Sequence, residues 1–360
     1  MSKTIRWGIL GTGVIARRFA EGLAHAPGAE LLAVGSRARS SAQVFAAELG
    51  ARRFYGSYEE LVADRDVDVV YIATPNTLHR ENALLCFDRG KAVLCEKPFT
   101  INAAEARSVI AVARQKRLFC MEAMWMRFSP LMTEADAVLR RGILGDLRMV
   151  SVQLGLSFEP SPEHRVFRPD LGGGALLDLG VYPISLAHKL LGRPTRVVSD
   201  TVLGPTGVDE QVSAILGYPG GRQAIVSASL RNRTTNEAVI MGTHGTMRLH
   251  EPLYRPEVLS FSRTPLEGAA PPGRARRSRH VGRLLQHPLV RDLSSRVAGL
   301  RTRSVARRTA GNGYDHEAVE VMRCLREGAL ESRIMPLDET VAVLETMDTI
   351  RGQVGPGQAR

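Results

Sequence analysis

Short apolar runs and amphipathic stretches alternate along the first third of the chain. The apolar runs predict strands, and stretches with apolar residues three or four positions apart predict helices. The run at residues 67–73 is almost continuously apolar, which is typical of a strand buried on both faces. The predicted strands lie at 5–10, 30–36, 67–73, 92–95 and 118–123, and the predicted helices at 14–25, 41–49, 82–89 and 102–116, with another opening at 57.

This regular alternation predicts an α/β domain over residues 1–123. A strand followed by a helix and another strand gives a parallel, doubly wound sheet with helices on both faces, which is the Rossmann arrangement. Ligands of such sheets bind at the carboxyl ends of the strands. We therefore expect a nucleotide-binding half whose functional residues follow the strands.

The pattern changes after Trp125, where strands follow one another with few helices between them. Such a succession predicts a large, mostly antiparallel sheet in a second domain, 124–360, of the α+β class. The strands are expected at 147–156, 195–203, 211–218, 223–230, 238–242, 247–250 and 258–261, and the helices at 131–141, 175–191, 314–327 and 337–351.

The net charge of +11 is concentrated in one segment. Residues 263–308 contain twelve arginines and two acidic residues, so this insertion alone carries a charge of +10. Its front part, to Arg279, is expected to be a mobile loop. Residues 281–305 could form a basic amphipathic helix that touches a membrane surface, a partner or nucleic acid. We favour a solvated insertion on the sheet domain, and nucleic-acid binding is not expected because no recognised motif supports it.

Composition narrows the cellular setting. A length of 360 residues with 44% hydrophobic content suits two globular domains, and no apolar run is long enough to span a bilayer. Glycines interrupt the N-terminal apolar run, so it is interpreted as a strand and loop rather than a signal peptide. The four cysteines form no Cys-x-x-Cys pair, which favours buried thiols in the cytoplasm and no metal site.

A glycine loop follows the first strand and opens the first helix. Gly11 permits a tight turn, Gly13 lets a pyrophosphate approach the backbone, and Ala16 allows close packing of helix on strand. The helix N-terminus adds N–H groups and positive potential for phosphates. The alternatives are an ordinary glycine turn or a loop for another nucleotide. The predicted dinucleotide contacts of this loop are Gly11, Thr12, Gly13, Val14 and Ile15.

The end of the second strand favours NADP over NAD. NAD-binding chains place an acidic residue there to bind the ribose 2′-hydroxyl, whereas this chain has Ser36 and Arg37. A guanidinium suits a 2′-phosphate dianion, and Arg39 is a reserve. The alternative is that these arginines are solvated loop charges.

A second loop, residues 73–79, follows the next strand of the same sheet edge. Pro75 and Asn76 indicate a turn, and the loop is expected to line the cofactor site together with Thr74. His79 is either a cofactor contact or a residue of the following helix end.

The buried run that begins at Ala92 ends in Glu96-Lys97-Pro98. A strand with this ending delivers one amine to the carboxyl edge of the sheet, where ligands bind. Asp178 and Tyr182 lie four residues apart on a predicted helix and so share a face. We expect Lys97 at the catalytic centre and Glu96 beside the cofactor.

With these motifs the chain resembles the glucose–fructose oxidoreductase / inositol dehydrogenase (Gfo/Idh/MocA) family of NAD(P)-dependent oxidoreductases. Details of residues 91–98, 121–128 and 144–148 resemble the branch of dimeric dihydrodiol dehydrogenases and NADP-dependent D-xylose dehydrogenases. The stretches that carry the family match are Gly11–Ala16, Glu96-Lys97-Pro98, Gly172–Tyr182 and Gly311–Tyr314.

The resemblance implies a Rossmann domain, an open-faced sheet domain, a cis bond before Pro98 and often a dimer formed through the sheet. It also places the helix of Asp178 and Tyr182 opposite Lys97. The implied activity is hydride transfer between NADP and a secondary hydroxyl of a sugar, polyol or cyclic diol. Tyr182 is the candidate proton acceptor, Lys97 polarises the substrate oxygen or is itself the base, and Asp178 orients the amine.

Trp125, Arg127, Phe128 and Arg168 are predicted walls of the substrate site, although Trp125 and Phe128 suit a domain joint equally well. Two other functions remain open on the same fold: a non-catalytic cofactor-binding regulator, and a scaffold that uses the basic insertion. A pure sensor would not need Lys97, Asp178 and Tyr182 together, so we favour the enzyme.

Overall fold

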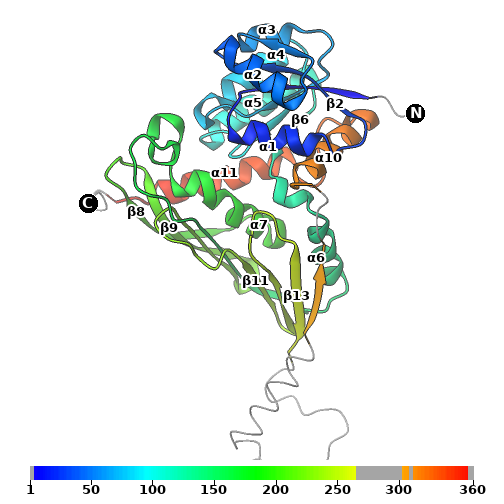
Figure 1. Cartoon of the computed structure of the whole chain (residues 1–360). Helices are drawn as coiled ribbons and strands as arrows, with labels where there is room; N and C mark the ends of the chain where they lie inside the picture. The colour runs from blue at the N-terminus through cyan, green and yellow to red at the C-terminus, as the bar shows by residue number, and fades with distance from the viewer. Residues whose placement is uncertain (1–3, 265–301, 308–310, 356–360) are drawn as a thin grey trace, which may run out of the picture.

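The computed structural model describes residues 4–264, 302–307 and 311–355. Figure 1 shows a compact α/β half, a broad sheet below it, and helices between the two. Within the described residues, none of the helices is long and apolar enough to cross a membrane.

The first half is the predicted Rossmann fold. Its six strands are all parallel and lie in the order β3-β2-β1-β4-β5-β6, so the order in which successive strands are added reverses between β1 and β4. The central strands are buried because their side chains are covered on both faces. The strands are β1 (Ile5–Leu10), β2 (Ala29–Gly35), β3 (Arg53–Tyr55), β4 (Val69–Ile72), β5 (Ala92–Glu96) and β6 (Cys120–Ala123).

Local capping explains where several helices of this half begin. The Ser57 hydroxyl accepts the Glu60 amide at 3.1 Å, and the Asn102 side chain accepts the Glu105 amide at 2.8 Å. The pattern missed β3, which is only three residues long, and placed the start of α4 too late. The helices are α1 (Val14–Leu23), α2 (Arg39–Leu49), α3 (Tyr58–Ala63), α4 (His79–Asp88) with the preceding 3₁₀ turn η1 (Asn76–Leu78), and α5 (Ala103–Lys116).

The second half contains the predicted mostly antiparallel sheet. Its eight strands lie in the order β14-β13-β12-β11-β7-β10-β9-β8, and only the β7–β10 pair is parallel. The strands are β7 (Leu147–Gly155), β8 (Arg196–Leu203), β9 (Asp209–Tyr218), β10 (Arg222–Ser229), β11 (Ala238–Gly242), β12 (Gly245–Leu249), β13 (Val258–Arg263) and β14 (Arg303–Ala306).

The helices of the second half cover one face of this sheet. The last two of them, α10 and α11, also contact the Rossmann half. Figure 1 shows α10 beside α1, and α11 between the two halves. A Cβ on Gly22 of α1 would lie 2.8 Å from the Tyr314 Cβ, so a glycine is needed for this close packing. The elements are η2 (Trp125–Phe128), α6 (Pro130–Arg140), η3 (Arg165–Phe167), η4 (Pro169–Leu171), the π-helical turn η5 (Leu176–Gly180), α7 (Val181–Leu191), η6 (Pro219–Gly221), α10 (Tyr314–Glu327) and α11 (Leu337–Arg351).

The two ends of the arginine-rich segment are strands of this sheet, which corrects its predicted bounds. Arg263 ends β13, and β14 pairs antiparallel with β13. The predicted helix over 281–305 is therefore wrong at its end, because residues 303–305 belong to β14 and pair with β13 in the sheet. The rest of that helix, and most of the predicted mobile front, lie outside the described residues.

Glu122 of β6 is a buried carboxyl that ties the Rossmann half to α11. It is 1% exposed, and it accepts the Phe99 amide N–H at 3.2 Å and the Thr340 hydroxyl at 2.9 Å. Burial raises the pKa of Glu122 to about 7 from an ordinary value of 4.5. The folded protein therefore keeps a proton that the unfolded chain loses, and this contribution to stability declines as the pH rises from 4.5 to 7.

We predict that Glu122→Gln removes this decline, because the uncharged amide oxygen accepts the Phe99 N–H and the amide NH2 group donates to the Thr340 hydroxyl. The difference in free energy of unfolding between variant and wild type should grow with pH and favour the variant by about 3 kcal/mol at pH 8. Urea unfolding at several pH values from 5 to 8 measures it. Glu59→Gln, at an exposed position, should show no such trend, and a constant difference for Glu122→Gln would contradict the prediction.

Candidate active site

Lys97 stands at the carboxyl end of β5, and its amine reaches across to the second half of the chain. The preceding strand is fully buried, and the Lys97–Pro98 peptide bond is cis, as the resemblance implies. The Lys97 Nζ donates to the Asp178 carbonyl oxygen at 2.7 Å and lies 3.4 Å from its Oδ1. The Lys97 side chain is only 13% exposed, so this amine is held in a largely dry setting.

Asp178 holds two cations. Its carboxylate also accepts Arg165 Nη2 at 3.1 Å and 3.3 Å, and the Arg165 side chain is 54% exposed. Burial alone would raise the pKa of Asp178, but the charges of Lys97 and Arg165 hold it below its ordinary value. Asp178 is therefore an anion that fixes the position of the amine.

The segment of Asp178 is a π-helical turn rather than the start of a regular α-helix. The Asp209 carboxylate, from β9, accepts the Leu176 amide N–H at 2.6 Å at the beginning of this turn. The α-helical pattern places Asp178 and Tyr182 on one face, and the structure brings both onto Lys97 by a wider turn. Periodicity alone could not reveal that turn.

Tyr182 meets Lys97 with its ring face rather than with its hydroxyl. The Lys97 Nζ lies 4.9 Å from the ring centroid, whereas the hydroxyl accepts the Trp125 indole N–H at 2.8 Å. Burial raises the pKa of Tyr182 well above 10, and the nearby Tyr314 and Glu96 act in the same direction. Tyr182 is therefore a neutral phenol in this structure.

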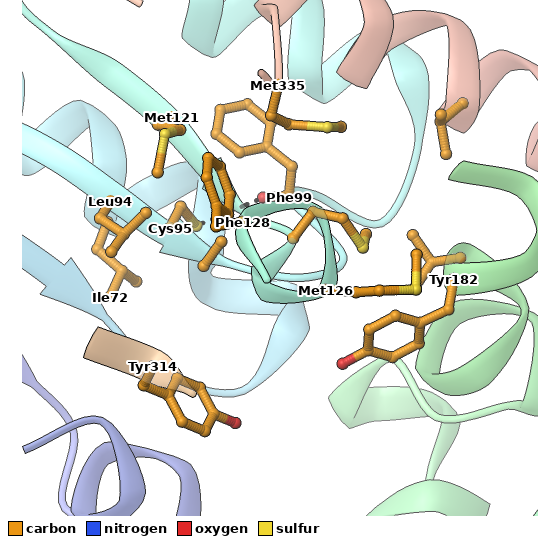
Figure 2. Close-up of a cluster of buried hydrophobic side chains, with 14 of the residues drawn as sticks. Ile72, Leu94, Cys95, Phe99, Met121, Met126, Phe128, Tyr182, Tyr314 and Met335 are labelled. Atoms are coloured by element: carbon orange, nitrogen blue, oxygen red, sulfur yellow. Dashed lines mark hydrogen bonds between the residues drawn. The ribbon is translucent and has the colours of Figure 1, made fainter. Parts of the chain in front are cut away.

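Trp125 lies at the centre of an aromatic group beside Tyr182. Its ring stacks on Tyr314 at a centroid distance of 4.5 Å and on Tyr254 at 5.9 Å. Figure 2 shows Tyr182 and Tyr314 with their hydroxyls directed into the space between them. Trp125 thus remains a candidate residue of the substrate site.

Glu96 is buried beneath this centre. Its carboxylate accepts the Tyr71 hydroxyl and, at 3.1 Å, the backbone amide of Lys97. Burial raises the pKa of Glu96, and the Lys97 charge opposes that rise. The contacts of Glu96 within the protein fix the end of β5.

Both ring nitrogens of His79 make contacts within the protein. Its ring is 1% exposed, with Nδ1 2.8 Å from the Pro98 carbonyl oxygen and Nε2 3.0 Å from that of Thr74. Both ring nitrogens therefore face backbone oxygens, and His79 joins the loop after β4 to the loop after β5.

The rest of that loop contacts the glycine turn of the second half. The Asn76 side chain donates to the Gly172 carbonyl oxygen at 2.9 Å, and the Thr77 hydroxyl donates to that of Asp170 at 3.2 Å. Pro75 lies between these contacts and Thr74, at the edge of the sheet. This loop therefore sets the position of the glycine turn relative to Lys97.

The glycine loop after β1 fits a dinucleotide. Gly11 has a φ of +102°, and a Cβ there would lie 2.7 Å from the Ala73 carbonyl oxygen. A Cβ at Gly13 would meet no atom within 4 Å, so the space before the N-terminus of α1 is open for a pyrophosphate. The neighbours Thr12, Val14 and Ile15 lie at the same edge, with Val14 69% exposed.

Ser36 and Arg37 follow β2 at the same edge. Ser36 is buried and its hydroxyl lies 3.4 Å from the Ala38 amide, whereas Arg37 is exposed. Arg39 packs over the Phe54 ring at 5.2 Å and lies 3.9 Å from Glu60. Arg37 is thus the better placed of the two arginines for a cofactor phosphate.

Three of the four residues predicted as substrate walls have other surroundings. Arg127 is 3% exposed and bonds Ser185 and Glu339, so it joins α7 to α11. Phe128 packs in a buried cluster with Phe99 (Figure 2). Arg168 pairs with the neighbouring Asp170. All of these contacts are within the protein.

Arg165 and Tyr314 were missed as site residues. Arg165 lies in a short turn that has no periodic pattern, so only the fold brings it to Asp178. Tyr314 stands in the motif Gly311–Tyr314, and its aromatic ring next to a helix start could have suggested a role.

The comparisons identify the class of protein. Residues 5–124 match the model of the oxidoreductase family with an NAD-binding Rossmann fold, and residues 132–248 match the GFO/IDH/MocA C-terminal domain. The chain therefore belongs to the Gfo/Idh/MocA family of oxidoreductases.

Its relatives include enzymes of two kinds. It is 34% identical over 355 residues to trans-1,2-dihydrobenzene-1,2-diol dehydrogenase of Bos taurus, and the matched region covers 98% of this chain and 97% of that protein. It is also 34% identical over 388 residues to D-xylose 1-dehydrogenase (NADP(+)) of Hypocrea jecorina, covering 98% and 92%.

Solved structures show the same fold. A 3-ketoreductase from Actinomadura kijaniata in complex with NADP gives a TM-score of 0.79 at 24% identity, covering 97% of this chain and 98% of that one. An aldose-aldose oxidoreductase from Caulobacter crescentus gives 0.78 at 22% identity, covering 97% of each chain.

We predict that Asp178→Asn lowers kcat/KM about 100-fold, because a misplaced amine no longer meets the reacting oxygen. The KM for the cofactor should change little, since the glycine loop is separate from Asp178. Steady-state kinetics measure both. Asp170→Asn is the matched control, because it removes a nearby exposed carboxylate that pairs with Arg168. Unchanged kcat/KM in Asp178→Asn would contradict the anchoring role.

Proposed function

We propose that this protein is an NADP-dependent oxidoreductase that transfers a hydride between nicotinamide and a secondary hydroxyl or carbonyl of a sugar or cyclic diol. The observation that carries the proposal is the meeting of Lys97, Asp178 and Tyr182 at the carboxyl edge of the Rossmann sheet. The sugar and diol dehydrogenases among its relatives support the substrate class.

The protein's part in this reaction is to place and move a proton. When bound, the nicotinamide supplies or accepts the hydride. Lys97 is the cation nearest the reacting oxygen and polarises it, while Asp178 holds the amine in place. Tyr182 exchanges the proton with that oxygen. The raised pKa of Tyr182 favours the phenol form, which donates a proton when a carbonyl is reduced.

This assignment separates an enzyme from a cofactor-binding regulator. A regulator needs the glycine loop but no amine held beside a carboxylate and a phenol. The observed anchoring of Lys97 by Asp178 therefore favours catalysis over sensing.

The first test is initial rates with aldoses, inositols and cyclic diols for wild type and Lys97→Met. We expect turnover of one substrate class, and a loss of at least about 100-fold in Lys97→Met because the polarising charge is gone. Arg89→Met, at an exposed position at the opposite edge of the sheet, should remain active. Tight NADPH binding without turnover of any substrate would favour the regulator.

The preference for NADP rests on Arg37. We predict that Arg37→Ala raises the KM for NADP about 10-fold and leaves the KM for NAD unchanged, because only NADP carries a 2′-phosphate for the guanidinium. Arg89→Ala is the matched control. Equal effects on both cofactors, or a wild type that prefers NAD, would rule out this role of Arg37.

We also propose that the protein is a homo-oligomer, formed through the open face of the sheet. Val198, Ile215 and Ile225 are register neighbours on β8, β9 and β10, and they are 50%, 42% and 38% exposed. Adjacent exposed apolar side chains of this kind suit a second copy. Sedimentation equilibrium tests this, and a monomer at micromolar concentration would contradict it.

We also propose a cytoplasmic location, because the cysteines are present as free thiols. All four cysteines are free and buried, which suits a reducing compartment.

A further inference from the structure

A second tyrosine lies opposite Tyr182. Tyr314 is the first residue of α10, it is 5% exposed, and its ring is parallel to the Trp125 indole within 11°. The same indole donates its N–H to the Tyr182 hydroxyl at 2.8 Å. One tryptophan therefore fixes the position of two phenols that come from different helices.

The Tyr314 hydroxyl is available for a ligand. Among the described residues it makes no hydrogen bond, whereas the Tyr182 hydroxyl already accepts the Trp125 indole N–H. In Figure 2 the Tyr314 hydroxyl points from the α10 side toward Tyr182, and the Tyr182 hydroxyl points back. Burial, with Glu96 and Glu317 nearby, raises the pKa of Tyr314, so this phenol stays neutral and can donate.

The two hydroxyls can serve two neighbouring oxygens of one substrate. In the proposed function Tyr182 and Lys97 act on the reacting oxygen, and the Trp125 indole occupies one lone pair of Tyr182. A second donor that faces Tyr182 from the other side then meets an oxygen on the next carbon. A buried phenol that finds no partner in a substrate loses binding energy, so such a donor selects against substrates without that oxygen.

We propose that Tyr314 is a specificity-determining residue whose hydroxyl binds the substrate hydroxyl next to the reacting carbon, so that the site selects vicinal diols. Aldoses in the ring form meet this requirement, because the hydroxyls on C1 and C2 are adjacent. This inference rests on the proposed function and adds to it the substrate feature that the site recognises.

The test compares matched substrate pairs on wild type and Tyr314→Phe at saturating NADP. The pairs are D-xylose with 2-deoxy-D-xylose, and trans-1,2-cyclohexanediol with cyclohexanol. Phenylalanine keeps the stacking on Trp125 and removes only the hydroxyl. We expect wild type to favour the diol of each pair at least about 10-fold in kcat/KM, and Tyr314→Phe to lose about 10-fold on the diol alone.

Tyr218→Phe is the matched control. Tyr218 ends β9, and its buried hydroxyl also lacks a partner among the described residues. That variant should keep the wild-type discrimination. Fluorescence titration with NADPH, run on every variant, reports folding and cofactor binding separately from turnover.

The outcomes separate this inference from the proposed function. Turnover by wild type without discrimination within either pair overturns the role of Tyr314 and leaves the dehydrogenase intact. An equal loss on both members of a pair, or a weaker NADPH affinity with unchanged discrimination, also overturns it and places the hydroxyl on the cofactor. No turnover of any substrate by wild type overturns both. If Tyr314→Phe does not fold, equal kcat/KM values of wild type within each pair still overturn the inference.

Discussion

The ion pair and hydrogen bond between Lys97 and Asp178 join the two halves of the molecule at the point where chemistry is expected. They connect residues 81 positions apart, one at the end of a parallel strand and the other in a π-helical turn. A buried amine requires a nearby anion, since an unpaired charge in a dry site costs several kcal/mol. The rest of the site is arranged around this requirement.

Other contacts keep that pair in register. Asn76 and Thr77 bind the turn that precedes Asp178, and His79 joins their loop to the loop that carries Pro98. Arg165 supplies a second positive charge to the Asp178 carboxylate from the exposed side. Lys97 therefore has both its backbone and its ionic partner fixed, which is the preorganisation that polarisation of a substrate oxygen needs.

The return of the chain to the Rossmann half brings a residue of α10 to the candidate site. Because α10 packs on α1 through Gly22, its first residue, Tyr314, reaches the Trp125 indole that also holds Tyr182. Residues from the beginning, middle and end of the sequence thus meet within one aromatic group. This arrangement brings the proposed specificity residue of the C-terminal helix and the proposed proton donor of the central helix to the same tryptophan.

The sequence determined the architecture and the main chemical groups. Period-two and period-3.6 patterns were sufficient to predict the parallel and antiparallel sheets, because the order of apolar residues shows whether an element is buried on one face or on two. The glycine loop and the lysine after β5 were found for the same reason, as their roles follow from local geometry. The three-residue strand β3 and the strand β14 were missed, since their stability comes from neighbouring strands rather than from their own residues.

Only the tertiary structure decided the partners of the polar side chains. The sequence suggested Arg127 as a substrate contact, yet its side chain is buried and hydrogen-bonded to Ser185 and Glu339. No sequence pattern indicated a role for Arg165, yet its guanidinium forms an ion pair with Asp178. A side chain's periodicity reports which face it occupies, whereas its hydrogen bonds depend on chain segments that are distant in sequence. The sequence thus specified the fold and, through the family resemblance, the meeting of Lys97 with Asp178 and Tyr182, whereas long-range packing decided that Arg165 and Tyr314 also lie there.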